Sequence, residues 1–529
     1  MAFNLGLLRV TQKRWDEAVV LLRQSLQHAP RQADAQYWLG NALMGAGHAP
    51  EARDAYEHAV KLDGAYAQAR WGRAMASLPA IALTTAEQQD APAVFRSELI
   101  KLRSWLRAQR PGDAVKAVGA QQPYYIAYIE QDHRRVLSEY GALCSAALEQ
   151  WPSRPKAPAL VRQTGDKFKL AIVSAHVHDH SVWHAIVRGW VEHLDPQTFE
   201  LTLCHTGAGE DEQTRWARQR LARFVSDVGG WEAWSHEIAD SGFDGIIYPE
   251  IGMDATTIRL ASQRLAPLQA ASWGHPITTG LPTVDMYFSA DAMEPPKAQQ
   301  HYTERLVRLP GIGCCYQAYG IPAMTSIDFA RWGIGEQERI LICPGVPNKY
   351  APRNDALWVE IARRCAPCKL VFFKPSESGL GELLASRLKR AFDAAGVSFE
   401  DSVRLIPWLP RGAFFALLDR AEAMLDTIGF SGFNTAMQAL ERQTPVVAWE
   451  GSFLRGRLAS GPLRAIGFSD AVVNDQAGYV SCVERLCKDQ GFSDQARHRI
   501  AAHRASLYEQ VESVAALGAE LMKSVGARA

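Results

Sequence analysis

The sequence of 529 residues has no apolar run near the roughly 20 residues that a helix needs to cross a bilayer. It also has no excess of charge, because Lys and Arg together number 57 and so do Asp and Glu. A neutral balance argues against a broad surface that binds polyanions. It does not argue against a local basic pocket. We therefore expect neither a membrane span nor a nucleic-acid partner.

Signals for secretion, disulfides and metal binding are also scarce. Residues 1–6 lack the basic start and long apolar stretch of a signal peptide, so we expect a cytoplasmic protein. The nine cysteines are scattered and odd in number, which fits reduced thiols. Cys365 and Cys368 form one CxxC without a second pair at a zinc-ribbon distance, and HExxH and DxD patterns are missing. We expect no metal and no cofactor.

The N-terminal part of the chain repeats. Leu5-Gly6 recurs 34 residues later as Leu39-Gly40, and Glu17-Ala18 recurs as Glu51-Ala52. A helix–turn–helix period of this length is typical of tetratricopeptide repeats, which we predict for residues 1–77. Such a solenoid either only stacks or offers a groove for an extended peptide. Residues 78–165 have an irregular helical pattern and read as a connector that ends in a Pro-rich linker at 152–166.

After the linker the chain alternates between short apolar runs and helical patterns, which is typical of α/β folds. The length of the chain predicts about two to four domains. We predict two doubly wound parallel sheets, a first lobe at 166–325 and a second lobe with C-terminal helices at 326–529, joined near 310–335, with a ligand between the lobes. The predicted strands are 168–174, 199–205, 245–248, 268–273, 286–289 and 306–309, then 340–343, 369–373, 403–406, 423–426 and 446–449.

A strand, a glycine-containing turn and a helix follow one another at residues 423–440. The apolar strand is followed by a turn that contains Gly429, Ser431 and Gly432, and a helix begins near Phe433. Such a turn gathers unpaired backbone N–H groups at the positive end of a helix dipole, which is how folds commonly hold a phosphate or diphosphate. The alternative is a tight turn without a ligand.

Two basic residues follow other strands of the same lobe. Lys349 comes after the strand at 340–343, and Arg411 comes after the strand at 403–406. Because parallel strands end at one edge of a sheet, both cations are expected on the side of the glycine turn. There they could stabilise a leaving diphosphate, whereas without that setting each would be an ordinary solvated side chain.

The first strand of the first lobe ends in a segment with four histidines, at positions 176, 178, 180 and 184. His180 and His184 share a face if a helix has begun by then. One imidazole could act as acid, base or positioning group. The alternatives are metal ligands, for which a third donor would be needed, and a polar turn with capping histidines.

Two further strand-end loops belong to the first lobe. Gly274-His275-Pro276 is a loop of small residues that lets a ligand approach the backbone closely. The segment 248–254 carries Glu250 and Asp254, either of which could serve as a base, although capping the next helix is the more ordinary role of Asp254.

Several of these stretches together resemble one known family. They are His180-Ser-Val-Trp-His184, Arg264-Leu-Ala-Pro-Leu-Gln, Gly274-His-Pro with Thr278-Thr-Gly280, His301-Tyr-Thr-Glu-Arg-Leu, Lys349, Leu425-Asp426-Thr427, Gly432 to Thr435, and Thr444-Pro445. With the repeats, they make the chain similar to the O-linked N-acetylglucosamine transferase family, and also to the related bacterial cytoplasmic N-glucosyltransferases. Gly274-His275-Pro276 is closer to the second group, and the repeats favour the first.

The resemblance implies a metal-independent, inverting transferase of the GT-B fold that uses a UDP-sugar. It places His180 on the family's active-site histidine and Lys349 on the lysine that meets the diphosphate. It places Asn434 and Thr435 at the phosphate-binding helix start, beside Gly432, and Arg411 beside the nucleoside. Phe433 replaces the family's histidine, Asn434 replaces a threonine, and Gln438 stands where a carboxylate usually holds the ribose.

From the residues and the resemblance we expect a protein glycosyltransferase that moves N-acetylglucosamine or glucose from a UDP donor to Ser or Thr, with the protein acceptor bound by the repeats and the cleft. His275 and Pro276 are expected to belong to the same binding site. The alternatives are an N-glucosyltransferase acting on Asn, a repeat scaffold with inactive lobes, and a transferase acting on a glycan or small molecule.

Overall fold

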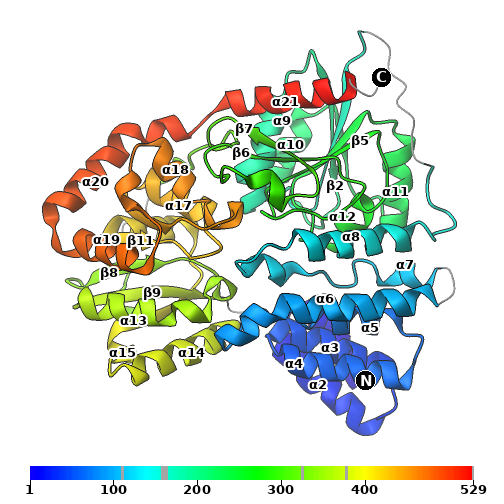
Figure 1. The fold of residues 1–529 in the computed structure, drawn as a ribbon, viewed down its shortest axis with the longest axis horizontal. Helices are drawn as coiled ribbons and strands as arrows, with labels where there is room; N and C mark the ends of the chain where they lie inside the picture. The colour runs from blue at the N-terminus through cyan, green and yellow to red at the C-terminus, as the bar shows by residue number, and fades with distance from the viewer. Residues whose placement is uncertain (109–111, 157–164, 323–326, 376–378, 527–529) are drawn as a thin grey trace. The chain divides into compact units, whose positions relative to one another are not determined.

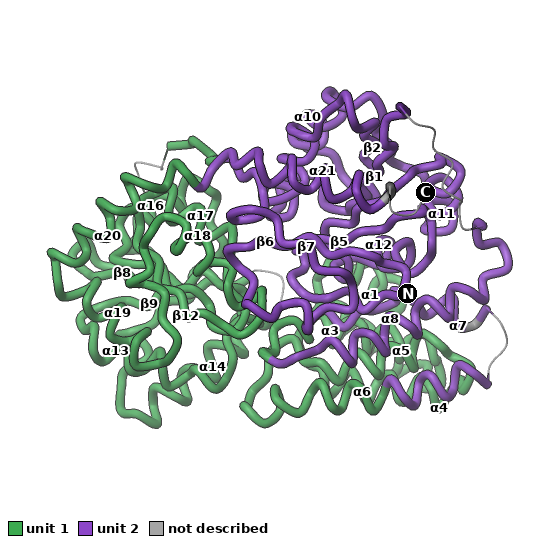
Figure 2. The backbone as a smooth tube through the Cα atoms, turned by 45° about the horizontal axis from the view of Figure 1, so that its top comes forward, with its two compact units in different colours: residues 1–98, 125–130, 318–506 green, residues 99–124, 131–317, 507–529 purple. Residues whose placement is uncertain are grey.

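A computed structural model describes residues 1–108, 112–156, 165–322, 327–375 and 379–526. The chain forms two compact units, drawn in different colours in Figure 2. Unit 1 consists of Met1–Glu98, Tyr125–Glu130 and Ala318–Ser506, and unit 2 consists of Leu99–Tyr124, Gln131–Gln317 and Leu507–Ala529. Residues 157–164, which make up most of the predicted linker, and residues 323–326 of the predicted junction lie outside the described part.

The N-terminal helices of unit 1 form antiparallel pairs, visible in blue in Figure 1. Gly6 packs against Leu22 and Gly40 against Tyr56, so closely that a Cβ at either glycine would lie 2.8 Å or 2.5 Å from the partner side chain. The repeated Leu-Gly pair is therefore explained by the close contact of two helices. The helices are α1 (Ala2–Thr11), α2 (Trp15–His28), α3 (Ala33–Ala46), α4 (Ala49–Leu62) and α5 (Ala67–Met75).

The repeats are anchored on the sheet part of unit 1 through helix α14 (Leu380–Ala394). Gly47 ends α3 with a positive φ of 90° and packs against Leu380. Arg387 of α14 is 3% exposed, pairs with Asp355 and donates to the backbone oxygens of Ala82 and Tyr350. The connector that follows comprises α6 (Thr85–Arg107), α7 (Asp113–Ala117), the 3-10 turn η1 (Tyr124–Tyr128) and α8 (Arg134–Leu148).

Unit 2 is built around a parallel sheet with the order β3-β2-β1-β4-β5-β6-β7 over its described residues. The strands are β1 (Phe168–Ser174), β2 (Phe199–His205), β3 (Arg223–Val225), β4 (Gly245–Tyr248), β5 (Leu268–Ser272), β6 (Met286–Ala290) and β7 (Arg305–Leu309). Its helices are the π-helical turn η2 (Trp183–Val187), α9 (Arg188–His193), α10 (Glu212–Arg220), α11 (Trp231–Asp240), α12 (Ala255–Ala261) and α21 (Val511–Gly526). The prediction placed both C-terminal helices with the second lobe, whereas α21 groups with unit 2.

Unit 1 contains a second parallel sheet with the order β10-β9-β8-β11-β12-β13 over its described residues. Its strands are β8 (Arg339–Cys343), β9 (Cys368–Lys374), β10 (Val403–Pro407), β11 (Ala423–Leu425), β12 (Val446–Trp449) and β13 (Val472–Val473). The helices are α13 (Asp355–Arg364), α14, α15 (Phe399–Ser402), α16 (Arg411–Arg420), α17 (Phe433–Glu441), α18 (Ser460–Ala465), α19 (Gln476–Lys488) and α20 (Gln490–His503). The predicted architecture of two doubly wound sheets after a helical repeat segment is confirmed.

Each sheet reverses its strand order at one point. In unit 2 the reversal lies between β1 and β4, which pair directly, and in unit 1 it lies between β8 and β11, which also pair. Loops diverge at such a point, and ligands of open α/β sheets bind there, at the carboxyl ends of the strands. The loops after β1, β4, β8 and β11 are therefore the places to look for a site. In the part of the chain that the structure describes, no helix is long and apolar enough to cross a membrane.

Candidate functional site

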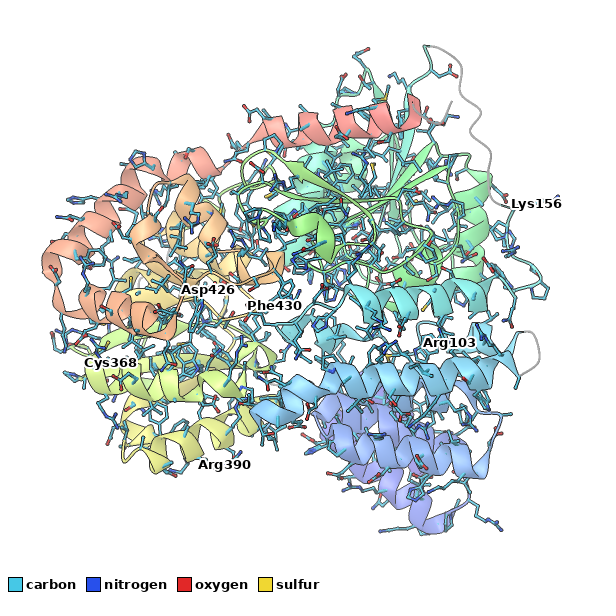
Figure 3. The ribbon with its side chains drawn as sticks, viewed as in Figure 1. Arg103, Lys156, Cys368, Arg390, Asp426 and Phe430 are labelled. Atoms are coloured by element: carbon cyan, nitrogen blue, oxygen red, sulfur yellow. The ribbon has the colours of Figure 1, made fainter. Side chains whose placement is uncertain are left out.

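Asp426 organises the loop between β11 and α17. The side chain of Ser431 and the backbone N–H of Gly432, at 2.8 Å, both donate hydrogen bonds to its carboxylate. Ser431 Oγ in turn accepts from the backbone N–H of Ala459 at 2.8 Å. Burial raises the pKa of Asp426 to about 6, although the hydrogen bonds from Ser431 and Gly432 favour its charged form. The predicted glycine turn is thus a hydrogen-bonded loop that leads directly into the helix. Figure 3 labels Asp426 and Phe430 of this loop.

Lys349 comes from the loop after the neighbouring strand, β8, and reaches this turn. Its ammonium group donates to the carbonyl oxygen of Ser431 at 3.1 Å and lies 4.7 Å from the centroid of the Phe430 ring. Burial lowers the pKa of Lys349 to about 8, against the opposing effect of Asp426. The structure therefore brings a cation to the start of α17, at the point where the sheet order reverses.

A short segment of the connector, which sequence reasoning did not assign to the site, packs on the same loop. The ring of Tyr128 stacks on Phe430 with centroids 4.4 Å apart and planes 27° from parallel. Glu130 pairs with Arg353 and accepts from the backbone N–H of Ser452 at 3.2 Å. These contacts join positions that are 223 to 322 residues apart in sequence, so no local sequence pattern predicts them.

The other predicted donor-side residues lie on or near the same elements. Gly432 is the N-cap of α17, and a Cβ there would lie 2.4 Å from Thr435 Oγ1. Asn434, Thr435 and Gln438 follow on α17, each half-buried. Arg411 begins α16 and its guanidinium stacks 3.9 Å from the ring centroid of Tyr319. The replaced Phe433 is buried as the first residue of α17.

In unit 2 the histidines after β1 form a cluster. The rings of His176 and His180 have centroids 4.2 Å apart, and His178 lies 5.8 Å from the first and 5.5 Å from the second. His184 is turned toward Asp179, with 2.7 Å between Nε2 and the carboxylate. Burial and the neighbouring His176 lower the pKa of His178. Burial, followed by the charges of His176, His178 and His184, lowers the pKa of His180 to about 3.

Glu250, from the loop after β4, contacts His176 of this cluster and is completely buried. Its Oε1 accepts from Ser174 Oγ at 2.8 Å and from the backbone N–H of Ala175 at 2.9 Å, and it lies 3.3 Å from His176 Nδ1. Burial raises the pKa of Glu250, against the hydrogen bonds from His176 and Ser174. The second carboxylate of this loop, Asp254, caps α12 through the N–H groups of residues 256 and 257, as predicted.

The loop of His275 and Pro276 packs on the Glu250 loop. The N–H of Gly274 donates to Pro249 O at 2.9 Å, and the ring of His275 lies against Gly252. The connector contributes Tyr124, whose ring stacks on His275 with centroids 5.2 Å apart. Within unit 2 the structure thus joins the predicted His180 and His275 loops through the loop that bears Glu250.

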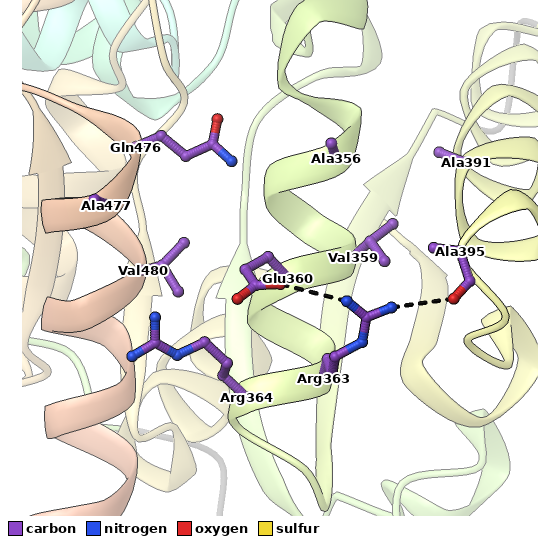
Figure 4. Close-up of a pocket in the computed structure, with 10 residues that line it drawn as sticks. All are labelled: Ala356, Val359, Glu360, Arg363, Arg364, Ala391, Ala395, Gln476, Ala477 and Val480. Carbon is purple, nitrogen blue, oxygen red and sulfur yellow. Dashed lines mark hydrogen bonds and ion pairs between the residues drawn. The ribbon is translucent and has the colours of Figure 1, made fainter.

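One groove of unit 1 lies away from these loops, between α13, α14 and α19 (Figure 4). It has a volume of about 710 Å³, and its polar rim includes Glu360, Arg363 and Gln476. Arg363 is already bonded to Glu360 and to the carbonyl of Ala395. Among the described residues, no group of three or more His, Cys, Asp or Glu side chains is arranged to hold a metal ion.

Comparison with known families bears on both parts of the chain. Residues 9–78 match the family model for the tetratricopeptide repeat, and residues 348–514 match the family model for glycosyl transferase family 41. The second match begins just before Lys349 and covers the loop of Asp426 and the helix α17. Residues 9–78 are thus similar to tetratricopeptide repeats, and residues 348–514 are similar to glycosyl transferase family 41.

The chain is also similar to curated proteins of two kinds. The chain is 26% identical over 238 residues to a probable UDP-N-acetylglucosamine–peptide N-acetylglucosaminyltransferase SPINDLY of Petunia hybrida, covering 43% of this chain and 24% of the relative. It is 38% identical over 258 residues to a UDP-glucose:protein N-beta-glucosyltransferase of Actinobacillus pleuropneumoniae, covering 48% of this chain and 40% of the relative. The chain therefore spans less than half the length of these relatives.

Among solved structures, an O-GlcNAc transferase mutant from Thermobaculum terrenum matches with a TM-score of 0.74 and 20% identity, over 100% of this chain and 99% of that one. The likeness shows that this chain shares the fold of that protein, in agreement with the predicted GT-B fold.

Proposed function

We propose that this protein transfers N-acetylglucosamine or glucose from a UDP donor to Ser or Thr side chains of proteins, with inversion and without a metal. The observation that carries the proposal is Lys349 held at the start of α17, where the sheet order of unit 1 reverses. A cation beside a helix N-terminus stabilises the charge that grows on a departing diphosphate. That is the task a metal would otherwise perform.

The proposal assigns a role to each of the donor-side residues, and their positions support it. Lys349 and the N–H groups at the start of α17 bind the diphosphate, with Gly432 leaving room for it and Asn434 and Thr435 offering polar side chains. Gln438, further along α17, hydrogen-bonds the ribose, and Arg411 lies beside the nucleoside. His180, His275 and Pro276 belong to the acceptor side, and the repeats bind the protein acceptor.

A screen of donors tests this proposal. The full chain is incubated with UDP-GlcNAc or UDP-glucose, with and without EDTA, and UDP release is measured beside the intact mass of a peptide pool containing Ser, Thr and Asn. We expect UDP release that EDTA does not reduce, with a mass increase of one hexose or one N-acetylhexosamine on the peptides. If the protein neither binds nor releases UDP, the proposal is rejected in favour of a repeat scaffold with inactive lobes.

A second candidate is transfer of glucose to Asn. It is favoured by the 38% identity to the N-beta-glucosyltransferase and by the Gly274-His275-Pro276 loop. Fragmentation of the modified peptides decides between the two, because the sugar is found on an amide nitrogen in one case and on a hydroxyl oxygen in the other. If a glycan is modified and no peptide is, the protein is a transferase that acts on a glycan or small molecule.

A further inference from the structure

His176 and His180 lie side by side but make opposite hydrogen bonds. His180 precedes the first turn of the helix that continues into η2, and its Nδ1 accepts the backbone N–H of Val182 at 3.2 Å. A ring nitrogen that accepts a hydrogen bond carries no proton. Neutral His180 therefore has its hydrogen on Nε2, and that atom donates rather than accepts.

His176 is bound the other way round. Its Nδ1 lies 3.3 Å from Glu250 Oε1, and a carboxylate oxygen accepts, so the hydrogen of the ring is on Nδ1. Nε2 of His176 then carries the lone pair. A carboxylate that orients one ring nitrogen and stabilises the imidazolium is the arrangement in which a histidine serves as a base.

The geometry of Glu250 is fixed from several sides. Ser174 Oγ donates to it while accepting the backbone N–H of His176 at 3.0 Å, so one hydroxyl links the carboxylate to the histidine's own backbone. The other oxygen, Oε2, is buried and has no hydrogen-bond partner among the residues that the structure describes. A buried carboxylate in this position gains most from a positive charge on His176.

We propose that His176, oriented by Glu250, takes the proton from the acceptor, and that His180 contributes a hydrogen-bond donor instead. The inference rests on the proposed function. As the bond between the acceptor atom and the anomeric carbon forms, the bond from that carbon to the diphosphate breaks and its electron pair leaves on UDP. The acceptor proton moves to Nε2 of His176, the imidazolium is paired with Glu250, and the proton then passes to water.

The neighbouring charges agree with this division of roles. His178 and His180 face His176 from its own loop, and Glu250 faces it from the loop after β4, with Asp254 acting on Glu250 from further along that loop. Asp179 is engaged with His184, Asp211 accepts the backbone N–H of Asp179, and His205 ends β2 beside His178. The lowered pKa of His180, about 3, keeps its ring neutral throughout the physiological range.

The test measures kcat and kcat/KM for UDP release from pH 5 to pH 9, with UDP-GlcNAc or UDP-glucose and the Ser/Thr/Asn peptide pool. In the wild type, rates should fall at low pH as the proton acceptor becomes protonated, and this fall is the acidic limb of the pH–rate profile. We expect Glu250→Gln to move this acidic limb to lower pH, because the carboxylate no longer stabilises the imidazolium, and Glu250→Asp to restore part of the wild-type profile. His176→Gln should lower kcat by about 10²-fold or more and abolish the limb.

His180→Gln should lower kcat and keep the acidic limb. Glu294→Gln is the matched control: Glu294 is also a buried carboxylate of unit 2 that accepts from Ser289 and Tyr302 hydroxyls, and its variant should leave the limb in place. UDP affinity, measured by calorimetry, should change by less than about threefold in all variants, because only kcat is affected.

Loss of the limb in His180→Gln, or an unchanged limb in Glu250→Gln, would overturn the assignment while leaving the proposed function intact. A wild-type protein that releases no UDP and binds none would overturn both. If Glu250→Gln does not fold, the comparison of His176→Gln with His180→Gln decides the question alone.

Discussion

Lys349 donates a 3.1 Å hydrogen bond to the carbonyl oxygen of Ser431, which ties the loop after β8 to the loop after β11. The two strands are neighbours in the sheet, so the link needs no long side-chain reach. Because Ser431 lies one residue before the N-cap of α17, the bond places a positive charge at the positive end of the helix. A buried cation at that point is costly, and the diphosphate of the proposed donor would relieve the cost.

Replacement of this lysine should remove the principal charge contact to the leaving group. We expect Lys349→Met to lower kcat by about 10²-fold or more, as loss of a single transition-state contact commonly does. Sugar transfer from the UDP donor measures the effect. Lys389→Met, at an exposed lysine of α14 that pairs with Glu400, is the matched control and should retain full turnover. Comparable rates in the two variants would contradict the role of Lys349.

The same lysine predicts how donor binding depends on pH. The pKa of Lys349 is lowered to about 8, so its ammonium form dominates at pH 7 and is lost as pH rises through 8. UDP binding favours the charged form, and its affinity should therefore fall between pH 7 and pH 9. Calorimetry with UDP measures the trend. In Lys349→Arg the guanidinium stays charged, and the fall should disappear even if affinity is lower overall.

The stacking of Tyr128 on Phe430 predicts that the connector supports the loop between β11 and α17, where the proposed donor binds. A stacked aromatic pair contributes about 0.5–1.5 kcal/mol beyond its buried area, so Tyr128→Ala should raise the Kd for UDP by up to roughly tenfold. Tyr128→Phe keeps the ring and should bind as the wild type does. Phe399→Ala removes an aromatic contact of unit 1 with Phe392 and serves as the control. Equal binding in all three variants would show that the stack does not position the loop.

The main strands were predictable from the sequence because each is an apolar run bounded by turn residues. The predicted ranges 168–174, 199–205 and 245–248 coincide with β1, β2 and β4. The edge strands β3 and β13 were missed, since three and two residues are too few to form a recognisable run. Their pairing is decided by the neighbouring strand rather than by their own composition.

Local patterns also located the loop between β11 and α17 but not the residues that pack on it. Lys349 and Gly432 each follow a predicted strand, so the topology of the sheet brings them together. Tyr128 and Glu130 reach the same loop from a distant connector, and their contacts depend on tertiary packing that has no sequence period. For His176 and Glu250, the sequence marked both loops as candidates. Only the pairing of β1 with β4 shows that the two side chains meet.

Gln438 allows a test of the departure from the family pattern. An amide can hydrogen-bond a ribose hydroxyl, but an anionic acceptor forms the stronger, charge-assisted bond. We therefore expect Gln438→Glu to tighten UDP binding several-fold. This change corresponds to the difference of about 1 kcal/mol between a neutral and a charged hydrogen bond. Gln438→Ala should weaken it. Calorimetry measures the affinity of each variant for UDP and for uracil alone. Only the affinity for UDP should change, because uracil has no ribose.

The buried pair of Arg387 and Asp355 predicts where unit 1 is most sensitive to charge loss. Arg387 is 3% exposed, and the two side chains are joined by hydrogen bonds of 2.9 and 3.0 Å. Arg387→Met would leave Asp355 buried without its partner, and breaking a buried pair in this way costs about 3–5 kcal/mol. Arg387 also donates to the carbonyl oxygen of Ala82, so the repeats should loosen from α14 at the same time.

Urea unfolding followed by tryptophan fluorescence measures the change in Arg387→Met, and limited proteolysis near residue 82 reports the loosened repeats. The double variant Arg387→Met/Asp355→Leu should recover much of the lost stability, because it removes both charges together. Lys389→Met, at an exposed pair on the same helix, should unfold like the wild type. A double variant no more stable than Arg387→Met would mean that the arginine acts through its bonds to the backbone of Ala82 and Tyr350 rather than through Asp355.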